Sequence, residues 1–156
     1  MASASSPFPL PAALPEDLAR IRDHWNSLKR GDAAMPFWDD VKLSALQEIG
    51  GQLMLLDSPL DHPQRFRFNM VGEEVRHAYA GNLVGKFIDE VPARPPIDFL
   101  AAQASATVEA RSPTLFAGDS RDGGGRPLLY DRLLLPLWGN GRIEMLLGGI
   151  GNMRRG

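Results

Sequence analysis

The chain contains no cysteine among its 156 residues. This absence excludes disulfides, thiolate metal sites, a cysteine nucleophile and flavin photochemistry through a cysteine adduct. An excess of positive charge is also missing, since 17 Lys and Arg stand against 19 Asp and Glu, for a formal net charge of −2. That balance disfavours binding of the whole chain to nucleic acid or to anionic lipid. The one local basic cluster, Arg154-Arg155, is expected to be a solvated tail.

Long hydrophobic runs are missing as well. No apolar stretch approaches the roughly 20 residues that a membrane-spanning helix needs. Residues 1–13 are small, rich in proline and uncharged, so they lack the features of a signal peptide and are expected to be disordered. These properties predict a cytoplasmic protein with no membrane span, and the length suits one domain.

An amphipathic helix is predicted over residues 14–31. Pro15 suits its first turn, Glu16 and Asp17 favour the positive end of its dipole, and Gly31 ends it. Its apolar stripe could pair with a second copy of the helix or cover the chain's own sheet. We expect a homodimer whose interface is formed by the stripe residues Leu18, Ile21, Trp25 and Leu28.

The period of the apolar residues changes after Gly51. Short runs and two-residue alternation predict strands, whereas residues 32–50 give no clear pattern. Asn140-Gly141 predicts a type I′ hairpin turn. The predicted order is strands 52–57 and 65–71, a short helix 73–79, a longer helix 95–111, and strands 114–119, 128–137 and 142–150. This order predicts an α+β fold in which helices cover one face of a five-stranded antiparallel sheet.

Several sequence motifs, together with this order of elements, resemble those of a known family. They are the Phe66-Arg67-Phe68-Asn69-Met70-Val71-Gly72-Glu73-Glu74 stretch, the Gly81-Asn82-Leu83-Val84-Gly85-Lys86 stretch, Trp25 with Gly31 and Met35-Pro36, and Leu135-Pro136-Leu137 with Gly141 and Ile143. Together they resemble the PAS domain family, in the single-PAS type common in alphaproteobacteria. The resemblance covers about residues 20 to 150 and implies a PAS-like domain over residues 32–152. It further implies a sheet that cradles a cavity under the central helices, and a role in signal transduction.

A ligand cavity is the strongest candidate site that follows from this resemblance. Polar groups that interrupt apolar walls are typical of a selective pocket. We expect the cavity to be lined by Tyr79, Phe87, Phe99, Gln103, Tyr130, Arg132 and Met145. In the alternative interpretation the aromatic side chains simply fill the core, and Gln103 and Arg132 face water.

Metal and cofactor chemistry finds little support in the sequence. Glu73 and His77 stand one helical turn apart, but alone they supply only two ligands, and His24 and His62 lie in separate segments. In some PAS domains a histidine on the longer helix binds haem, and residues 95–111 contain none. Haem and a cysteine-adduct flavin are therefore disfavoured, and the cofactor is unknown.

Catalytic motifs are similarly weak. The serines lack a nucleophile-elbow setting, and Gly123-Gly124-Gly125 precedes a strand and lacks the Lys-Ser/Thr of a phosphate-binding loop. We therefore predict a sensor that is not an enzyme, that binds a small ligand and that acts through a protein partner such as a kinase or a regulator. The alternative is a ligand-free dimerisation or docking module. A third hypothesis is a small isomerase-like enzyme that uses Asp131.

Overall fold

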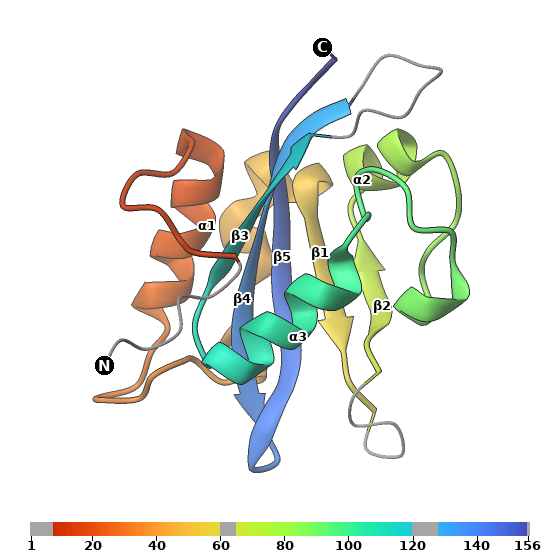
Figure 1. Ribbon diagram of the computed structural model, residues 1–156. Helices are drawn as coiled ribbons and strands as arrows, with labels where there is room; N and C mark the ends of the chain where they lie inside the picture. Colours follow the sequence, from red (N-terminus) through yellow and green to blue (C-terminus); the bar gives the residue numbers. More distant parts are fainter. Residues whose placement is uncertain (1–7, 60–64, 120–127, 156) are drawn as a thin grey trace, which may run out of the picture.

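The computed structural model describes residues 8–59, 65–119 and 128–155. Within these residues five strands form one antiparallel sheet in the order β2-β1-β5-β4-β3 (Figure 1). The bounds are β1 (Leu53–Asp57), β2 (Arg67–Val71), β3 (Thr114–Asp119), β4 (Leu128–Gly139) and β5 (Arg142–Arg155). The fold is therefore α+β with an antiparallel five-stranded sheet, as the sequence predicts.

The helices divide between the two faces of this sheet. They are α1 (Glu16–Ser27), α2 (Glu73–Tyr79) and α3 (Leu100–Ala110), with 3-10 turns η1 (Trp38–Asp40), η2 (Leu43–Gln52) and η3 (Ile88–Glu90). Figure 1 shows α3 running across the strands. The face under α3, named here the inner face, carries Arg132, whose Nε donates to Gln103 Oε1 of α3. Among the described residues, no helix combines the length and the apolar character needed to cross a membrane.

The opposite, outer face of the sheet is covered by α1. Leu18, Ile21 and Trp25 are buried there, and Trp25 Nε1 donates to the Pro136 carbonyl oxygen at 2.9 Å. A Cβ atom on Gly149 of β5 would lie 2.3 Å from Ile21 Cδ1, so the absence of a side chain at Gly149 lets the helix approach the strand. The apolar stripe thus covers the chain's own sheet, which is the second of the two alternatives.

Leu28, the last residue of the predicted dimer stripe, is half-buried and follows directly after α1. Pairing of two copies through the stripe would require the three buried residues to leave the core. Their position favours a structural role, and pairing of the chain with itself stays a prediction.

The longer helix begins later than the sequence predicts. Residues 95–111 were expected to be helical, and α3 covers Leu100–Ala110. Phe99 has a φ of +59°, which is outside the helical region and ends any helix that approaches from residue 95. The carbonyl oxygens of Pro96 and Asp98 accept from the Arg132 guanidinium. The segment before α3 is therefore bonded to the sheet, and the Arg132 side chain takes the place of helical backbone donors.

Other local predictions are confirmed with small differences. The short helix is α2, but its left-handed terminal residue is Ala80, with φ of 63°, not Gly81. Asn140 and Gly141 have φ of 50° and 76°, as a type I′ turn requires. The segment that had no clear pattern forms η1 and η2. His62 and the Gly123-Gly124-Gly125 run lie outside the described residues.

The predicted disordered segment 1–13 is described only from residue 8 onward. There the Phe8 carbonyl oxygen accepts from the Leu115 amide at 3.3 Å, and the Phe8 ring lies 6.0 Å from the ring of Phe116. The end of this segment therefore contacts β3.

Candidate functional site

Arg132 is the centre of a polar cluster buried between α3 and the inner face of the sheet. Its side chain is 0% exposed. Nε donates to Gln103 Oε1 at 2.7 Å, Nη1 to the Pro96 carbonyl at 2.9 Å, and Nη2 to the Asp98 carbonyl at 2.9 Å. In the sheet, Arg132 of β4 lies opposite Phe116 of β3 on one side and opposite Ile150 of β5 on the other. A fully buried guanidinium is costly unless its nitrogen atoms have hydrogen-bond acceptors, and here a neutral oxygen accepts from each of the three nitrogens.

Gln103 connects this arginine to α3 and β3. Its Nε2 donates to the Arg132 carbonyl at 3.0 Å and to Thr114 Oγ1 at 3.1 Å. Thr107 Oγ1 donates to the Gln103 carbonyl at 2.8 Å and lies 2.7 Å from Thr114 Oγ1. Gln103 and Arg132 therefore do not face water, contrary to that part of the alternative interpretation. The Arg132 cluster, as named here, comprises Asp98, Gln103, Thr107, Thr114, Tyr130 and Arg132.

Asp98 supplies the negative charge nearest to this arginine. Its Oδ1 accepts from the Tyr130 hydroxyl. Burial raises the pKa of Asp98, and the charge of Arg132 partly opposes that rise. Burial lowers the pKa of Arg132 to about 9, against the opposing effect of Asp98, so the guanidinium stays charged at neutral pH. The hydrogen bonds described for Arg132 use only the backbone carbonyl of Asp98, so its positive charge has no carboxylate in direct contact.

A cleft lies beside the Arg132 cluster, at the start of α3. It has a volume of about 740 Å³ and is lined by residues from η3 and from the segment that leads into α3. Asp98 belongs to both the cleft and the cluster, and Arg94 lines the cleft as well. Phe99, also in the lining, is 64% exposed, and its ring lies 5.7 Å from that of Phe116. Arg132 Cζ lies 4.7 Å from the centre of the same Phe116 ring.

The structure brings together some of the predicted cavity residues and separates others. Gln103, Tyr130 and Arg132 meet in the Arg132 cluster, with Phe99 at its edge. Tyr79 is buried outside the Arg132 cluster, where its hydroxyl donates to the Pro92 carbonyl at 2.7 Å and its ring centre lies 4.1 Å from Cζ of the cleft residue Arg94. Phe87 is half-buried near β2, with Arg65 Cζ 3.9 Å from its ring centre. Met145 lies on the outer face of the sheet and lines a different pocket.

Several members of the site were not found by sequence reasoning, namely Asp98, Thr107, Thr114 and Phe116. A signal for three of them was present. Thr114 and Phe116 alternate along β3, and pairing of β3 with β4 sets Phe116 opposite Arg132. Thr107 stands one helical turn after Gln103 in α3, which places both on the same side of that helix.

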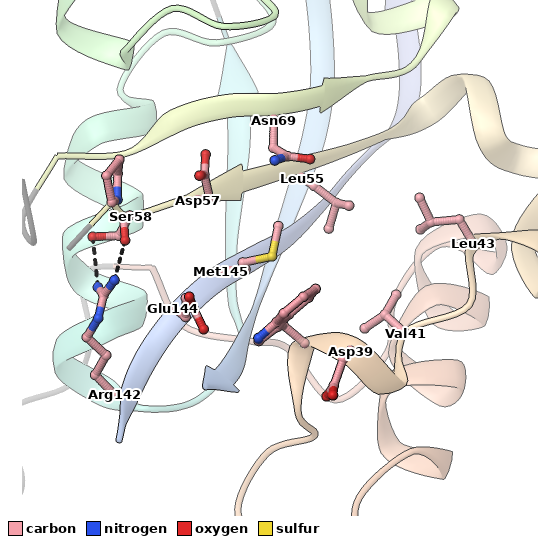
Figure 2. Close-up of a pocket in the computed structure, with 12 residues that line it drawn as sticks. Asp39, Val41, Leu43, Leu55, Asp57, Ser58, Asn69, Arg142, Glu144 and Met145 are labelled. Carbon is pink, nitrogen blue, oxygen red and sulfur yellow. Dashed lines mark hydrogen bonds between the residues drawn. The ribbon is translucent and has the colours of Figure 1, made fainter. Parts of the chain in front are cut away.

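A second hollow lies on the outer face of the sheet and is named here the outer groove. Its volume is about 610 Å³. Figure 2 shows Leu55 and Met145 of the sheet, with Val41 and Leu43 on the neighbouring segment. The polar residues in its lining are Asp39, Asp57, Ser58, Asn69, Arg142 and Glu144, and Trp38 completes the wall beside η1.

The remaining chemistry-bearing residues lie apart from both sites. Asp131 lies between Tyr130 and Arg132 in β4, its side chain accepts from Asn152 Nδ2 at 3.2 Å, and strand alternation turns it away from the Arg132 cluster. Glu73 pairs with Arg76, and His77 is exposed. No group of three or more His, Cys, Asp or Glu in the described segments could hold a metal ion.

No family model, no curated protein and no solved structure matches the chain. The fold class and the geometry of the two sites are therefore the observations on which a function is proposed.

Proposed function

We propose that the chain is a PAS-type sensor module that binds a small anionic ligand in the cleft beside Arg132 and signals to a protein partner. The order of elements and the position of α3 across one face of an antiparallel sheet agree with the predicted PAS resemblance (Figure 1). One observation carries the proposal. A completely buried guanidinium is held by neutral oxygen atoms next to a cleft large enough for a small molecule.

The charges around the cleft favour an anion. Arg94 lines the cleft, and Arg132 lies directly behind Asp98. Asp89, a carboxylate in the same lining, is neutralised by Arg65 at 2.7 Å. Two positive charges therefore stand against one uncompensated carboxylate, that of Asp98. A ligand carboxylate that reached Arg132 would replace a neutral acceptor with a charged one, which strengthens the hydrogen bond.

The segment from Pro95 to Phe99 gives this site a means to signal. Its carbonyl oxygens hold Nη1 and Nη2 of Arg132, so a ligand that takes these donors releases the segment. The segment leads directly into α3, whose Gln103 also holds Arg132. Binding would thus change the start of α3, and a partner such as a kinase or regulator would read that change.

Titration calorimetry with benzoate and its neutral analogue benzamide tests the proposal. We expect benzoate to bind at least tenfold more tightly. Arg132→Lys should weaken benzoate binding, and Arg142→Lys on the outer face is the matched control. Arg94 is exposed, so Arg94→Gln is a second variant that should keep the fold and still weaken benzoate severalfold. Equal affinity for the two probes, or an unchanged affinity in Arg94→Gln, would contradict the proposal.

The pH dependence of benzoate binding supplies a further check. A bound anion raises the pKa of Asp98 further, because two negative charges would lie close together. Binding therefore takes up a proton, and the affinity for benzoate should increase as the pH falls towards the raised pKa of Asp98. An affinity for benzoate that decreases as the pH falls would contradict a site beside Asp98.

A ligand-free docking module is the second candidate. It is favoured by the completeness of the Arg132 cluster, in which Gln103, Thr107 and Thr114 satisfy one another. Native mass spectrometry of the freshly purified chain separates the two. Excess mass that disappears on denaturation supports the sensor. A dimer without excess mass, together with no response to benzoate, supports the docking module.

A further inference from the structure

The outer groove has an apolar floor and a wall that are built from segments far apart in the sequence. Leu55 of β1 and Met145 of β5 lie side by side on the sheet, and Val41 and Leu43 follow η1 (Figure 2). The volume of about 610 Å³ suits a small organic molecule. Trp38 adds an indole that is 44% exposed, and among the described aromatic side chains Phe99 alone shares such exposure.

The wall formed by Trp38 is held in place by backbone and ionic contacts. The Trp138 amide donates to the Pro36 carbonyl at 2.9 Å, and Phe37 forms a parallel bridge with Trp138. Arg30 binds both carboxylate oxygens of Asp40, each at 2.8 Å, and so fixes the turn that carries Trp38. The exposed indole is therefore positioned before any ligand arrives.

The side chains of Trp38 and Glu144 both pack against Gly139. A Cβ atom on Gly139 would lie 2.5 Å from Trp38 Cδ1 and 2.2 Å from Glu144 Oε2. Only a residue without a side chain leaves room for both groups at this point. Gly139 thus brings the Trp38 indole and the Glu144 carboxylate together at one point of the groove, so a cation bound to this carboxylate would lie next to the exposed indole.

The charges of the groove leave this carboxylate without a cationic partner. Asp57 is paired with Arg67 at 2.7 Å. Within the described residues, the Glu144 carboxylate accepts from the neutral Asn140 side-chain amide, at 2.9 and 3.0 Å. Arg142 is the one guanidinium in the lining, and it donates to Ser58 (Figure 2). In the described residues, neither Glu144 nor Asp39 forms an ion pair. Two carboxylates therefore face one guanidinium that is already bound to neutral oxygens.

We propose that the outer groove binds a small organic cation with an apolar body, such as an arylalkylammonium ion. The body lies on the Leu55 and Met145 floor, and the ammonium group donates to the Glu144 carboxylate next to Trp38. This site is on the opposite face of the sheet from the Arg132 cluster and takes the opposite charge. It is independent of the proposed anion sensor.

Calorimetric titration with phenethylammonium and its neutral analogue 2-phenylethanol tests this assignment. The cation is expected to bind at least tenfold more tightly than the alcohol. Glu144→Gln keeps the shape of the side chain and should weaken the binding of the cation about tenfold. Glu109→Gln is the matched control, because Glu109 is an exposed carboxylate on α3, on the other face of the sheet, and the affinity should not change.

A second variant keeps the test decisive if Glu144→Gln disturbs the hairpin. Gly139→Ala displaces Trp38 and Glu144 together and should abolish binding in a chain whose circular dichroism is unchanged. Equal affinity for the cation and the alcohol overturns the proposal, as does wild-type affinity in Glu144→Gln or Gly139→Ala. Binding of a lysine-rich peptide without binding of phenethylammonium also overturns it, because the groove would then take a protein partner. Tyr130→Phe, on the inner face, should leave the affinity for phenethylammonium unchanged, so failure of this proposal and failure of the anion sensor are distinguishable.

Discussion

The two faces of the sheet are formed by the same strands but differ in how their polar groups are paired. On the inner face, Arg132 and Gln103 are buried polar groups whose donors are satisfied by the protein itself. On the outer face, α1 contributes apolar side chains, and the groove beside it keeps an exposed indole and carboxylates open to solvent. A buried polar group is costly unless it forms hydrogen bonds within the protein, whereas a polar group at an open groove can bond to water until a ligand binds. The inner face is therefore sensitive to the loss of one side chain, and the outer groove is sensitive to changes in charge.

The largest expected effect concerns the apolar half of the outer face. Ile21→Glu places a carboxylate against Gly149 in the core, and we expect the free energy of unfolding to fall by more than about 4 kcal/mol. Urea denaturation followed by circular dichroism measures this change. Leu28→Glu is the matched control, with an expected loss of about 1 kcal/mol, because Leu28 is only half-buried. A folded Ile21→Glu chain that is monomeric where the wild type is dimeric would show that the stripe is an interface.

The next effect compares the two arginines directly. Arg132→Leu leaves the acceptors Pro96, Asp98 and Gln103 without their donor, and the unfolding free energy should fall by about 3–5 kcal/mol. Arg142→Leu on the outer face removes only the contact with Ser58 and should cost about 1 kcal/mol. Urea titrations of both variants under the same conditions measure these losses. Similar losses for the two variants would remove the distinction between the faces.

A smaller effect is expected at the glycine under the outer groove. Gly139→Ala forces Trp38 and Glu144 to move, at a cost of about 1–3 kcal/mol. Gly50→Ala is the control, because a Cβ atom there has no neighbour within 4 Å, and the thermal midpoint should hardly change. An equal response to both substitutions would show that Trp38 is not held against the strand.

The smallest effect is a dependence of stability on pH through α1. Burial lowers the pKa of His24 from 6.5, and Nε2 is buried without a partner in the described structure. The unfolded chain therefore binds a proton more readily, so the contribution of His24 is complete above about pH 6.5 and is lost as the pH falls through its folded value. His24→Gln should reduce the change in the thermal midpoint between pH 7.5 and pH 5.5. His77→Gln, at an exposed position, should not reduce this change. A wild-type slope in His24→Gln would contradict this assignment.

Local patterns were sufficient for most of the elements. The spacing of Leu18, Ile21 and Trp25 predicts α1, alternation around Phe68 predicts β2, and Asn140-Gly141 predicts the hairpin between β4 and β5. Each of these depends on neighbours within a few residues. The start of α3 was placed wrongly because the positive φ of Phe99 is unfavourable for that residue and follows from bonds to Arg132, 33 positions away.

The candidate sites were predicted less completely than the elements. Gln103, Tyr130 and Arg132 could be selected as polar or aromatic groups in predicted core elements. Asp98 could not, because the sequence placed it inside a helix. In β4 the residues from Leu133 to Leu137 are apolar on both faces of the sheet, so no alternation indicates which face Arg132 occupies. Met145 was assigned to the wrong side of the sheet for the same reason.

The sequence by itself determined the α+β class, the helix at its start and the hairpin at its end, because propensity and periodicity act over short distances. Only the tertiary structure decided that the stripe of α1 covers its own sheet, since an apolar face does not specify what covers it. The tertiary structure also decided which polar groups meet. Arg132 joins Pro96 and Asp98 of one segment to Gln103 of α3, and the outer groove joins η1 to three strands. Such contacts follow from strand register and helix placement, which depend on the packing of the whole core.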